Sequence, residues 1–421
     1  MNKKILVSSF LGNFLEIYDF TLFGLLLTAL SPVFFPSDDP VASLLNGYIL
    51  FAVGFFARPV GAFLFSYIGD RYGRKSALTL SILCMSIPTA CIAFMPTYQQ
   101  IGILAPTLLG ILRFIQGVCA GGEYNGAGLF VVEHAQGKTK FLYGALLTSA
   151  GYMGAFFASV VSLICIYAVN GSWAWRIPYL IGATIGLVGL YLRSKADETP
   201  EFLGQKTKMH NSYLKVLKTY WAEKLCVLAI GGMAVVPLYT ATAFLNTFLY
   251  ATGKVDKISL MVLNAAVFFL SGINLTINGL LIKHFDPAKM MKFACVLTLI
   301  FSWPLFWLCT QESFLLICIS ELVLLLFMNF FIAPSLAFMS SLFPVEARYR
   351  GTAIPYCLGM AIFGGTAPYL SAKLIQLTSC SEAPAFYLMI VSLFGWLAVH
   401  KGKQIADIRM NEAGTSLTKI A

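Results

Sequence analysis

The chain has 421 residues, of which 58% are hydrophobic and only 11% are charged, and its mean hydropathy is +0.78. This composition leaves too little polar surface to cover a water-soluble globule, so lipid must surround most of the chain. The formal net charge of +10 could indicate a nucleic-acid partner, but most of the Lys and Arg fall in short loops between apolar segments, and no nucleic-acid partner is predicted.

The first apolar segment begins at residue 5, after a short basic start. It continues well past an ordinary signal core, carries Glu16 and Asp19, and has no small-residue cleavage site, so it is interpreted as a membrane helix and not as a leader. Apolar runs long enough to cross about 30 Å of hydrocarbon predict twelve membrane helices, at 5–31, 41–68, 76–95, 101–131, 140–168, 175–192, 224–250, 258–283, 290–310, 313–342, 350–378 and 383–400.

The loops set the orientation and the division of the chain. Because short cytoplasmic loops are enriched in Lys and Arg, the alternating distribution of these residues predicts that both termini are cytoplasmic. A long hydrophilic segment separates the sixth and seventh helices. We therefore predict an N-terminal six-helix bundle at 1–192, a cytoplasmic linker at 193–223, a C-terminal six-helix bundle at 224–400 and a short cytoplasmic tail without coiled-coil heptads at 401–421.

The two halves share weak internal similarity. Segment 66–75, after the second helix, has a degraded counterpart at 279–289, after the eighth, and segment 133–144 is paralleled by 346–351. Repeats of this kind place a substrate site between the halves, near the middle of the membrane.

Several motifs make the chain recognisable. The loop DRYGRK (70–75) resembles the helix 2–3 signature of the major facilitator superfamily, and RFIQG (113–117) resembles its proton-coupling motif. The remaining motifs are GNFLEIYDF (12–20), ARPVG (57–61), GGEY (121–124), WRIP (175–178), ETPEF (198–202) and LFP (342–344).

Together these motifs resemble the metabolite:proton symporter branch, which includes proline/betaine, α-ketoglutarate, citrate and shikimate transporters. The chain is also similar to phagosomal amino-acid transporters of intracellular bacteria. The resemblance implies an all-α membrane protein with twelve transmembrane helices in two pseudo-symmetric six-helix bundles, the major facilitator fold. It also implies a location in the bacterial inner membrane.

Charged residues inside the predicted helices are candidates for proton coupling, because each costs about 3 kcal/mol to insert at bilayer depth. Glu16, Asp19 and Arg113 lie near the middle of their helices, and the resemblance implies that helices 1 and 4 face each other across the cavity. A carboxylate beside an arginine releases its proton readily and retains it when the arginine moves away. We predict Asp19 and Glu16 as proton carriers, with Glu123 and Glu321 as further candidates. The alternative is a set of permanent structural ion pairs.

Glu123 lies ten residues beyond Arg113, about 15 Å further along the helix. Arg58 is its expected partner, and this pair is interpreted as a gate or structural lock more than as a proton carrier. At the cytoplasmic face, the resemblance implies a charge relay that closes the outward-facing state from below, and the alternative is a solvated basic turn. With Arg58, the gate residues are predicted to be Asp70, Arg71, Arg74 and Glu133.

The predicted substrate residues are polar or aromatic and lie near the middle of the membrane: Arg113, Asn13, Tyr18, Gln116, Tyr239, Asn246, Asn329 and Tyr356. A zwitterion needs a cation and an anion nearby, and Arg113 with Asp19 or Glu16 supplies both. The sequence therefore favours symport of an amino acid or betaine with protons, by alternating access. A carboxylate symporter is the alternative, although a citrate-like trianion would need several cations.

Other classes fit less well. A facilitator would use the same helices without proton coupling, and a drug/proton antiporter would carry a proline in the glycine-rich motif that falls at 144–154. A membrane sensor would need a signalling domain, and an enzyme would need a P-loop, a zinc constellation or a nucleophile–base pair, which the sequence lacks. The ten scattered cysteines are interpreted as apolar packing residues. No cofactor or metal is predicted, and we expect a monomer.

Overall fold

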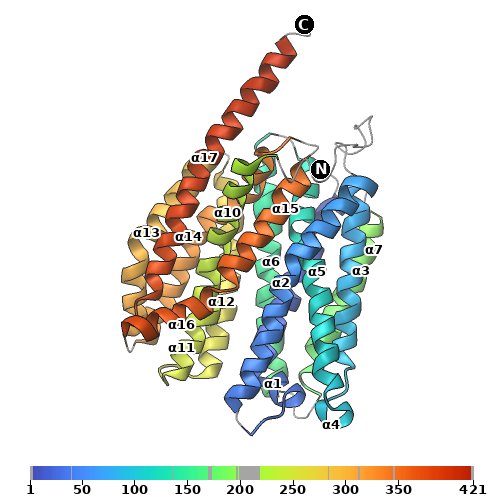
Figure 1. Ribbon diagram of the computed structural model, residues 1–421, viewed down its shortest axis with the longest axis vertical. Helices are drawn as coiled ribbons and strands as arrows, with labels where there is room; N and C mark the ends of the chain where they lie inside the picture. Colours follow the sequence, from blue (N-terminus) through green and yellow to red (C-terminus); the bar gives the residue numbers. More distant parts are fainter. Residues whose placement is uncertain are drawn as a thin grey trace.

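The computed structural model describes residues 3–38, 40–135, 137–168, 173–195, 198, 219–282, 284–311, 313–344 and 347–418. Every regular element in these ranges is a helix. Figure 1 shows two adjoining groups of long helices, the first drawn in blue to green and the second in yellow to red. The start of the first helix and the end of the last lie at the same end of the bundle, here named the termini end.

The first half contains α1 (Lys3–Phe34), α2 (Pro40–Tyr72), α3 (Arg74–Ala93), the single turn α4 (Tyr98–Ile101), α5 (Leu104–Glu133), α6 (Thr139–Ala168) and α7 (Arg176–Ser194). The second half contains α10 (Trp221–Tyr239), η1 (Thr240–Leu245), α11 (Asn246–Ala251), α12 (Lys257–Leu281), α13 (Pro287–Thr310), α14 (Phe314–Ser341), α15 (Arg348–Gly359), η3 (Met360–Gly364), α16 (Ala367–Thr378) and α17 (Pro384–Thr418).

Within the described ranges, eleven helical segments are long and apolar enough to cross a membrane. The remaining predicted span, 350–378, consists of α15, the π-helical segment η3 and α16. A second π-helical segment, η1, interrupts the span from 221 to 250. π-helical turns are rare and occur mostly at functional sites. Among the described residues, both π-helical segments lie in the second half.

Glycines allow the closest helix contact in the first half. A Cβ atom on Gly61 of α2 would overlap the carbonyl group of Val118, and one on Gly121 of α5 would overlap the carbonyl group of Arg58. Backbones can approach this closely only where the side chain is a hydrogen atom. Between the halves, α2 packs on α15, and α6 packs on α12 and α14.

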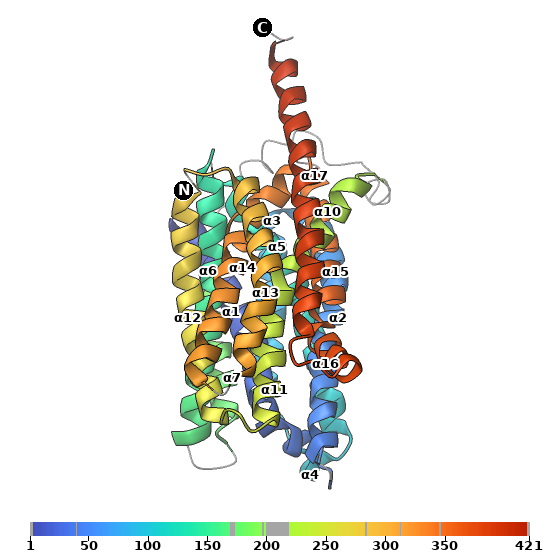
Figure 2. The ribbon, with the colours of Figure 1, turned by 90° about the vertical axis from the view of Figure 1, so that its left-hand side faces the viewer.

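The last helix extends beyond the bundle (Figure 2). The boundary between the C-terminal bundle and the tail is predicted at residue 400, but α17 continues through it without a break to Thr418. Two ion pairs attach this extension to the bundle. Lys403 Nζ lies 2.6 Å from Asp286 Oδ2, and Arg409 Nη2 lies 2.7 Å from Glu223 Oε1.

Candidate functional site

A cavity of about 240 Å³ lies where the two halves meet. Its wall is formed by α1, α2, α5 and α6 of the first half and by α10, η1 and α12 of the second. On α1 the lining residues include Asn13, Ile17, Thr21 and Gly24. These residues follow one another at intervals of three or four, which places them on a single face of the helix.

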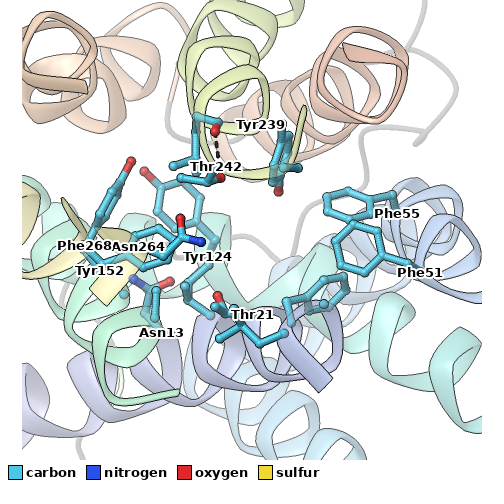
Figure 3. A pocket seen from close by; sticks show the side chains of 18 of the residues that line it. Asn13, Thr21, Phe51, Phe55, Tyr124, Tyr152, Tyr239, Thr242, Asn264 and Phe268 are labelled. Carbon is cyan, nitrogen blue, oxygen red and sulfur yellow. Dashed lines mark hydrogen bonds between the residues drawn. The ribbon is translucent and has the colours of Figure 1, made fainter. Parts of the chain in front are cut away.

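One side of the cavity, here named the aromatic side, carries Phe51 and Phe55, and the opposite side, here named the polar side, carries two amides beside the rings of Tyr152 and Phe268 (Figure 3). On the aromatic side the rings of Phe51 and Phe55 lie 5.1 Å apart, and those of Phe55 and Tyr239 lie 5.3 Å apart. The opposite side carries the amides of Asn13 and Asn264. A small solute with one apolar and one polar end is therefore complementary to this space.

The Asp19 carboxylate belongs to a fully buried network one layer outside the cavity wall. It lies 3.8 Å from Arg113 Nη1 and accepts hydrogen bonds from Gln116 Nε2 at 2.5 Å and from Thr89 Oγ1 at 3.0 Å. Arg113 Nη1 also donates to Gln116 Oε1 at 3.0 Å. Helices α1, α3 and α5 thus share one polar cluster, which includes three of the residues singled out in the sequence.

The Phe20 ring contacts both this network and a second ion pair. The guanidinium carbon of Arg113 lies 4.8 Å from the ring centroid, and that of Arg58 lies 4.1 Å from it. Arg58 lines the cavity, and its Nη1 lies 3.4 Å from Glu16 Oε1. Both Glu16 oxygens lack a hydrogen-bond partner among the described residues.

The predicted pairing of Arg58 with Glu123 is wrong. Arg58 projects from α2 toward α1 and pairs with Glu16, whereas Glu123 Oε1 lies 2.6 Å from Arg193 Nη1 of α7. Arg193 also donates to the carbonyl oxygens of Leu78 at 3.0 Å and Ser8 at 2.9 Å. Arg58 is therefore a cavity residue, and the lock around Glu123 joins helices of the first half only.

The other predicted residues divide between the cavity and its surroundings. Asn13 and Tyr239 line the cavity, and Tyr356 stacks on the lining residue Tyr124 with ring centroids 5.5 Å apart. Asn246 donates to the lining residue Asn264 at 2.9 Å. Away from the wall, the structure places Tyr18, which donates to Pro178 O at 2.6 Å, Asn329, which donates to Ser271 O at 3.5 Å, and the buried Glu321.

Charged side chains join the two halves at the termini end. Asp70 at the end of α2 pairs with Arg74 and lies 2.6 Å from Arg350 Nε at the start of α15. Glu133 at the end of α5 lies 3.8 Å from Arg74 and 3.9 Å from Arg348. Three of the predicted gate residues therefore meet in one cluster, completed by two arginines of the second half.

Arg71 lies outside this cluster. Its side chain is exposed and donates to Tyr67 Oη on its own helix, because it projects from the outer face of α2. Sequence reasoning also gave no role to Glu198, which accepts hydrogen bonds from the backbone nitrogens of Arg74 and Lys75, each at 3.1 Å. A carboxylate at this position satisfies free N–H groups at the start of α3 and complements the helix dipole.

Comparisons with known proteins identify the class. Residues 4–278 match the family described as "Sugar (and other) transporter". The chain is 31% identical to a "Putative proline/betaine transporter" of Staphylococcus aureus (strain COL), over 99% of this chain and 90% of the relative. It is 30% identical to the "Proline/betaine transporter" of Escherichia coli (strain K12), over 96% of this chain and 84% of the relative.

Among solved structures, the fold is similar to that of the major facilitator superfamily proton:xylose symporter XylE bound to 6-bromo-6-deoxy-D-glucose. The TM-score is 0.78, at 15% identity over 94% of each chain. The chain belongs to the sugar (and other) transporter family and has the major facilitator fold. It is a multi-pass membrane transporter and not an enzyme, and the resemblance seen in its motifs is confirmed.

Proposed function

We propose that this transporter imports a small zwitterion, an amino acid or a betaine, together with protons, across the bacterial inner membrane. The observation that carries the proposal is the arrangement around Phe20. The arginines of two ion pairs contact this ring: Arg58, which lines the cavity and pairs with Glu16, and Arg113, which is buried and pairs with Asp19. A substrate in the cavity can therefore act on the proton-carrying network through a single side chain.

The size and charge of the cavity support a small zwitterion. A volume of about 240 Å³ is below the roughly 300–1,000 Å³ typical of pockets for drug-sized ligands. Of the described residues that line it, Arg58 alone carries a positive charge, and the Glu16 carboxylate already pairs with it. A polyanion such as citrate would remain poorly neutralised, which favours the zwitterion over the carboxylate alternative. The names of the proline/betaine relatives point to the same substrate class.

Coupling follows from the Asp19 network. In the alternating-access cycle, Asp19 would take a proton from the outside, lose its attraction to Arg113 and release the proton after the cavity opens inward. The distribution of basic residues supports a cytoplasmic termini end. The Asp70–Arg350 cluster then closes the cytoplasmic side.

The test is uptake of proline and glycine betaine into proteoliposomes that contain the purified protein. An inward proton gradient should drive accumulation above the external concentration, and a protonophore should abolish it. Uptake that stops at equal concentrations and ignores the gradient would identify a facilitator. Strong citrate or α-ketoglutarate uptake without proline or betaine uptake would favour the carboxylate alternative.

A further inference from the structure

Asn13 presents an acceptor atom to the polar side of the cavity. Its Nδ2 donates to the carbonyl oxygen of Leu147 on α6 at 2.7 Å. Gly151 leaves room for this contact, because a Cβ atom there would lie 2.7 Å from Nδ2. The orientation of the amide is therefore fixed by a backbone carbonyl, which can only accept. Its Oδ1 is turned toward the cavity (Figure 3) and has no hydrogen-bond partner among the described residues, although Asn13 is only 1% exposed.

Asn264 presents the complementary donor. Asn246 Nδ2 donates to the carbonyl oxygen of Thr242 at 2.9 Å and to Asn264 Oδ1 at 2.9 Å. Because the Thr242 carbonyl can only accept, the orientation of Asn246 is set, and Asn264 must direct its oxygen toward Asn246. The Asn264 NH₂ group is then left for the cavity, where Figure 3 shows its nitrogen.

We propose that these two amides recognise the two ends of an α-amino acid that retains at least one N–H. The substrate ammonium group donates to Asn13 Oδ1, and the substrate carboxylate accepts from Asn264 Nδ2. The apolar part of the substrate faces Phe51 and Phe55 on the aromatic side. This inference rests on the proposed function and selects, within it, primary and secondary amino acids such as proline over fully N-methylated betaines.

The selection follows from the cost of an unpaired buried acceptor. A quaternary ammonium group has no hydrogen to donate, so it would cover Asn13 Oδ1 without satisfying it. A site built to hydrogen-bond an N–H group discriminates strongly against an analogue that lacks it. Because Asn13 belongs to the first half and Asn264 to the second, one substrate molecule also bridges the two bundles.

The test compares dissociation constants of purified protein in nanodiscs for proline, N-methylproline and N,N-dimethylproline, measured by calorimetry at one pH. These zwitterions carry two, one and no N–H groups. We expect the first methylation to have a small effect and the second to weaken binding by about tenfold or more. In Asn13→Leu, which keeps the approximate side-chain volume but lacks the acceptor, the difference between N-methylproline and N,N-dimethylproline should fall to about twofold.

Asn278→Leu is the matched control, because it removes a buried amide of α12 that lies outside the cavity wall. It should retain the wild-type preference. A parallel comparison tests the donor. Proline should bind more tightly than prolinol, which lacks the carboxylate, and Asn264→Leu should reduce this ratio while leaving the N-methylation series unchanged.

Equal binding of N-methylproline and N,N-dimethylproline to the wild type would overturn the inference without any variant. A preference that survives in Asn13→Leu would show that steric exclusion, and not the Asn13 oxygen, selects the substrate. If the wild type binds N,N-dimethylproline more tightly than proline, the proposed function stands and the selection is reversed. If it binds no amino acid or betaine while binding another solute, the proposed function itself fails.

Discussion

The Asp70 carboxylate and the Arg350 guanidinium lie 2.6 Å apart, with their side chains only 8% and 4% exposed, and they belong to different halves of the chain. Their contact has to break whenever the halves separate at the termini end. Close to it, Tyr349 Oη of α15 donates to the carbonyl oxygen of Gly122 on α5 at 3.1 Å, and Cys357 Sγ donates to that of Gly121 at 3.5 Å.

Asp70→Asn is expected to favour the conformation that is open at the termini end. Removing one partner of a buried ion pair costs about 3–5 kcal/mol, and the part of this cost that comes from the lost contact with Arg350 falls only on the closed state. Proton-driven uptake should fall several-fold, while the dissociation constant for substrate should change by less than about threefold. Alkylation of Cys357, followed by peptide mass spectrometry, should become faster because its thiol is buried only while the halves are in contact.

Arg71→Ala is the control for this change, because Arg71 is the next residue of α2 but lies outside the ion-pair cluster. It should leave uptake and Cys357 alkylation at wild-type values. Wild-type alkylation and uptake in Asp70→Asn would show that Asp70 does not control the opening.

Asp19→Asn should separate exchange from accumulation. The amide resembles a permanently protonated carboxyl, so the halves can still alternate around bound substrate but no proton is released. Counterflow of labelled substrate should persist within about tenfold of wild type, and gradient-driven accumulation should disappear. Accumulation against a gradient by Asp19→Asn would transfer the coupling role to Glu16, Glu123 or Glu321.

Arg58 and Glu16 should behave as one unit. Arg58→Gln alone leaves Glu16 buried without its cation and should lower stability by about 3–5 kcal/mol. The double variant Glu16→Gln/Arg58→Gln should recover about half of this loss, with a coupling energy of about 2–3 kcal/mol in a double-mutant cycle. The measurement is the unfolding midpoint in detergent. Additive single effects would show that the 3.4 Å pair contributes no interaction energy.

The ion-pair partner of Glu123 could not be predicted from the sequence. Hydropathy and charge indicate the membrane spans and the depth of Asp19 and Arg113, because helix length and bilayer depth can be estimated from the sequence. The family resemblance adds that the helices carrying these two residues face each other. Arg193 follows Glu123 by 70 residues. Because it falls at the start of the predicted linker, the sequence does not distinguish it from an ordinary loop cation. Which of two arginines an acid meets depends on how helices are rotated about their axes, and that rotation is set by tertiary packing.

The amides of the cavity illustrate the same limit. Asn13 and Asn246 are both predicted to bind substrate, but Asn246 donates to Asn264, a lining residue that the sequence does not single out. Both Asn13 and Asn246 donate to a backbone carbonyl, and they differ in that Asn13 lines the cavity whereas Asn246 also donates to the lining residue Asn264.

Gly12→Ala should destabilise the first half strongly. Its Cβ atom would overlap the Glu123 carboxylate and would lie 2.5 Å from Arg193 Nη2, so the buried ion pair would have to move. We expect a loss of about 2–4 kcal/mol, measured as a lower unfolding midpoint. Gly189→Ala on α7 is the control. A Cβ atom there would meet Ile82 at 3.6 Å, an ordinary van der Waals distance, and stability should be unchanged or slightly higher.

The contact between α17 and the start of α13 should weaken only in acid. Partial burial raises the pKa of Asp286, but the hydrogen bonds from Lys403 Nζ and from the Lys289 backbone nitrogen outweigh it and bring the pKa below its usual value. The stabilisation is therefore present above about pH 4 and is lost as pH falls through the lowered pKa. For this partly exposed pair it amounts to about 0.5–1 kcal/mol. Lys403→Gln should lower the unfolding midpoint at pH 7, and the difference should shrink as the pH falls below about 4 and through the lowered pKa of Asp286.

The π-helical segments η1 and η3 have a consequence for comparing sequences. A π turn contains one residue more than an α turn, and one residue corresponds to about 100° of rotation around a helix. Positions after 245 or 364 are therefore rotated by that angle relative to an unbroken helix. An alignment of the two halves without a single-residue gap in each segment would pair positions 246–251 and 365–378 with positions about 100° away around the corresponding helices.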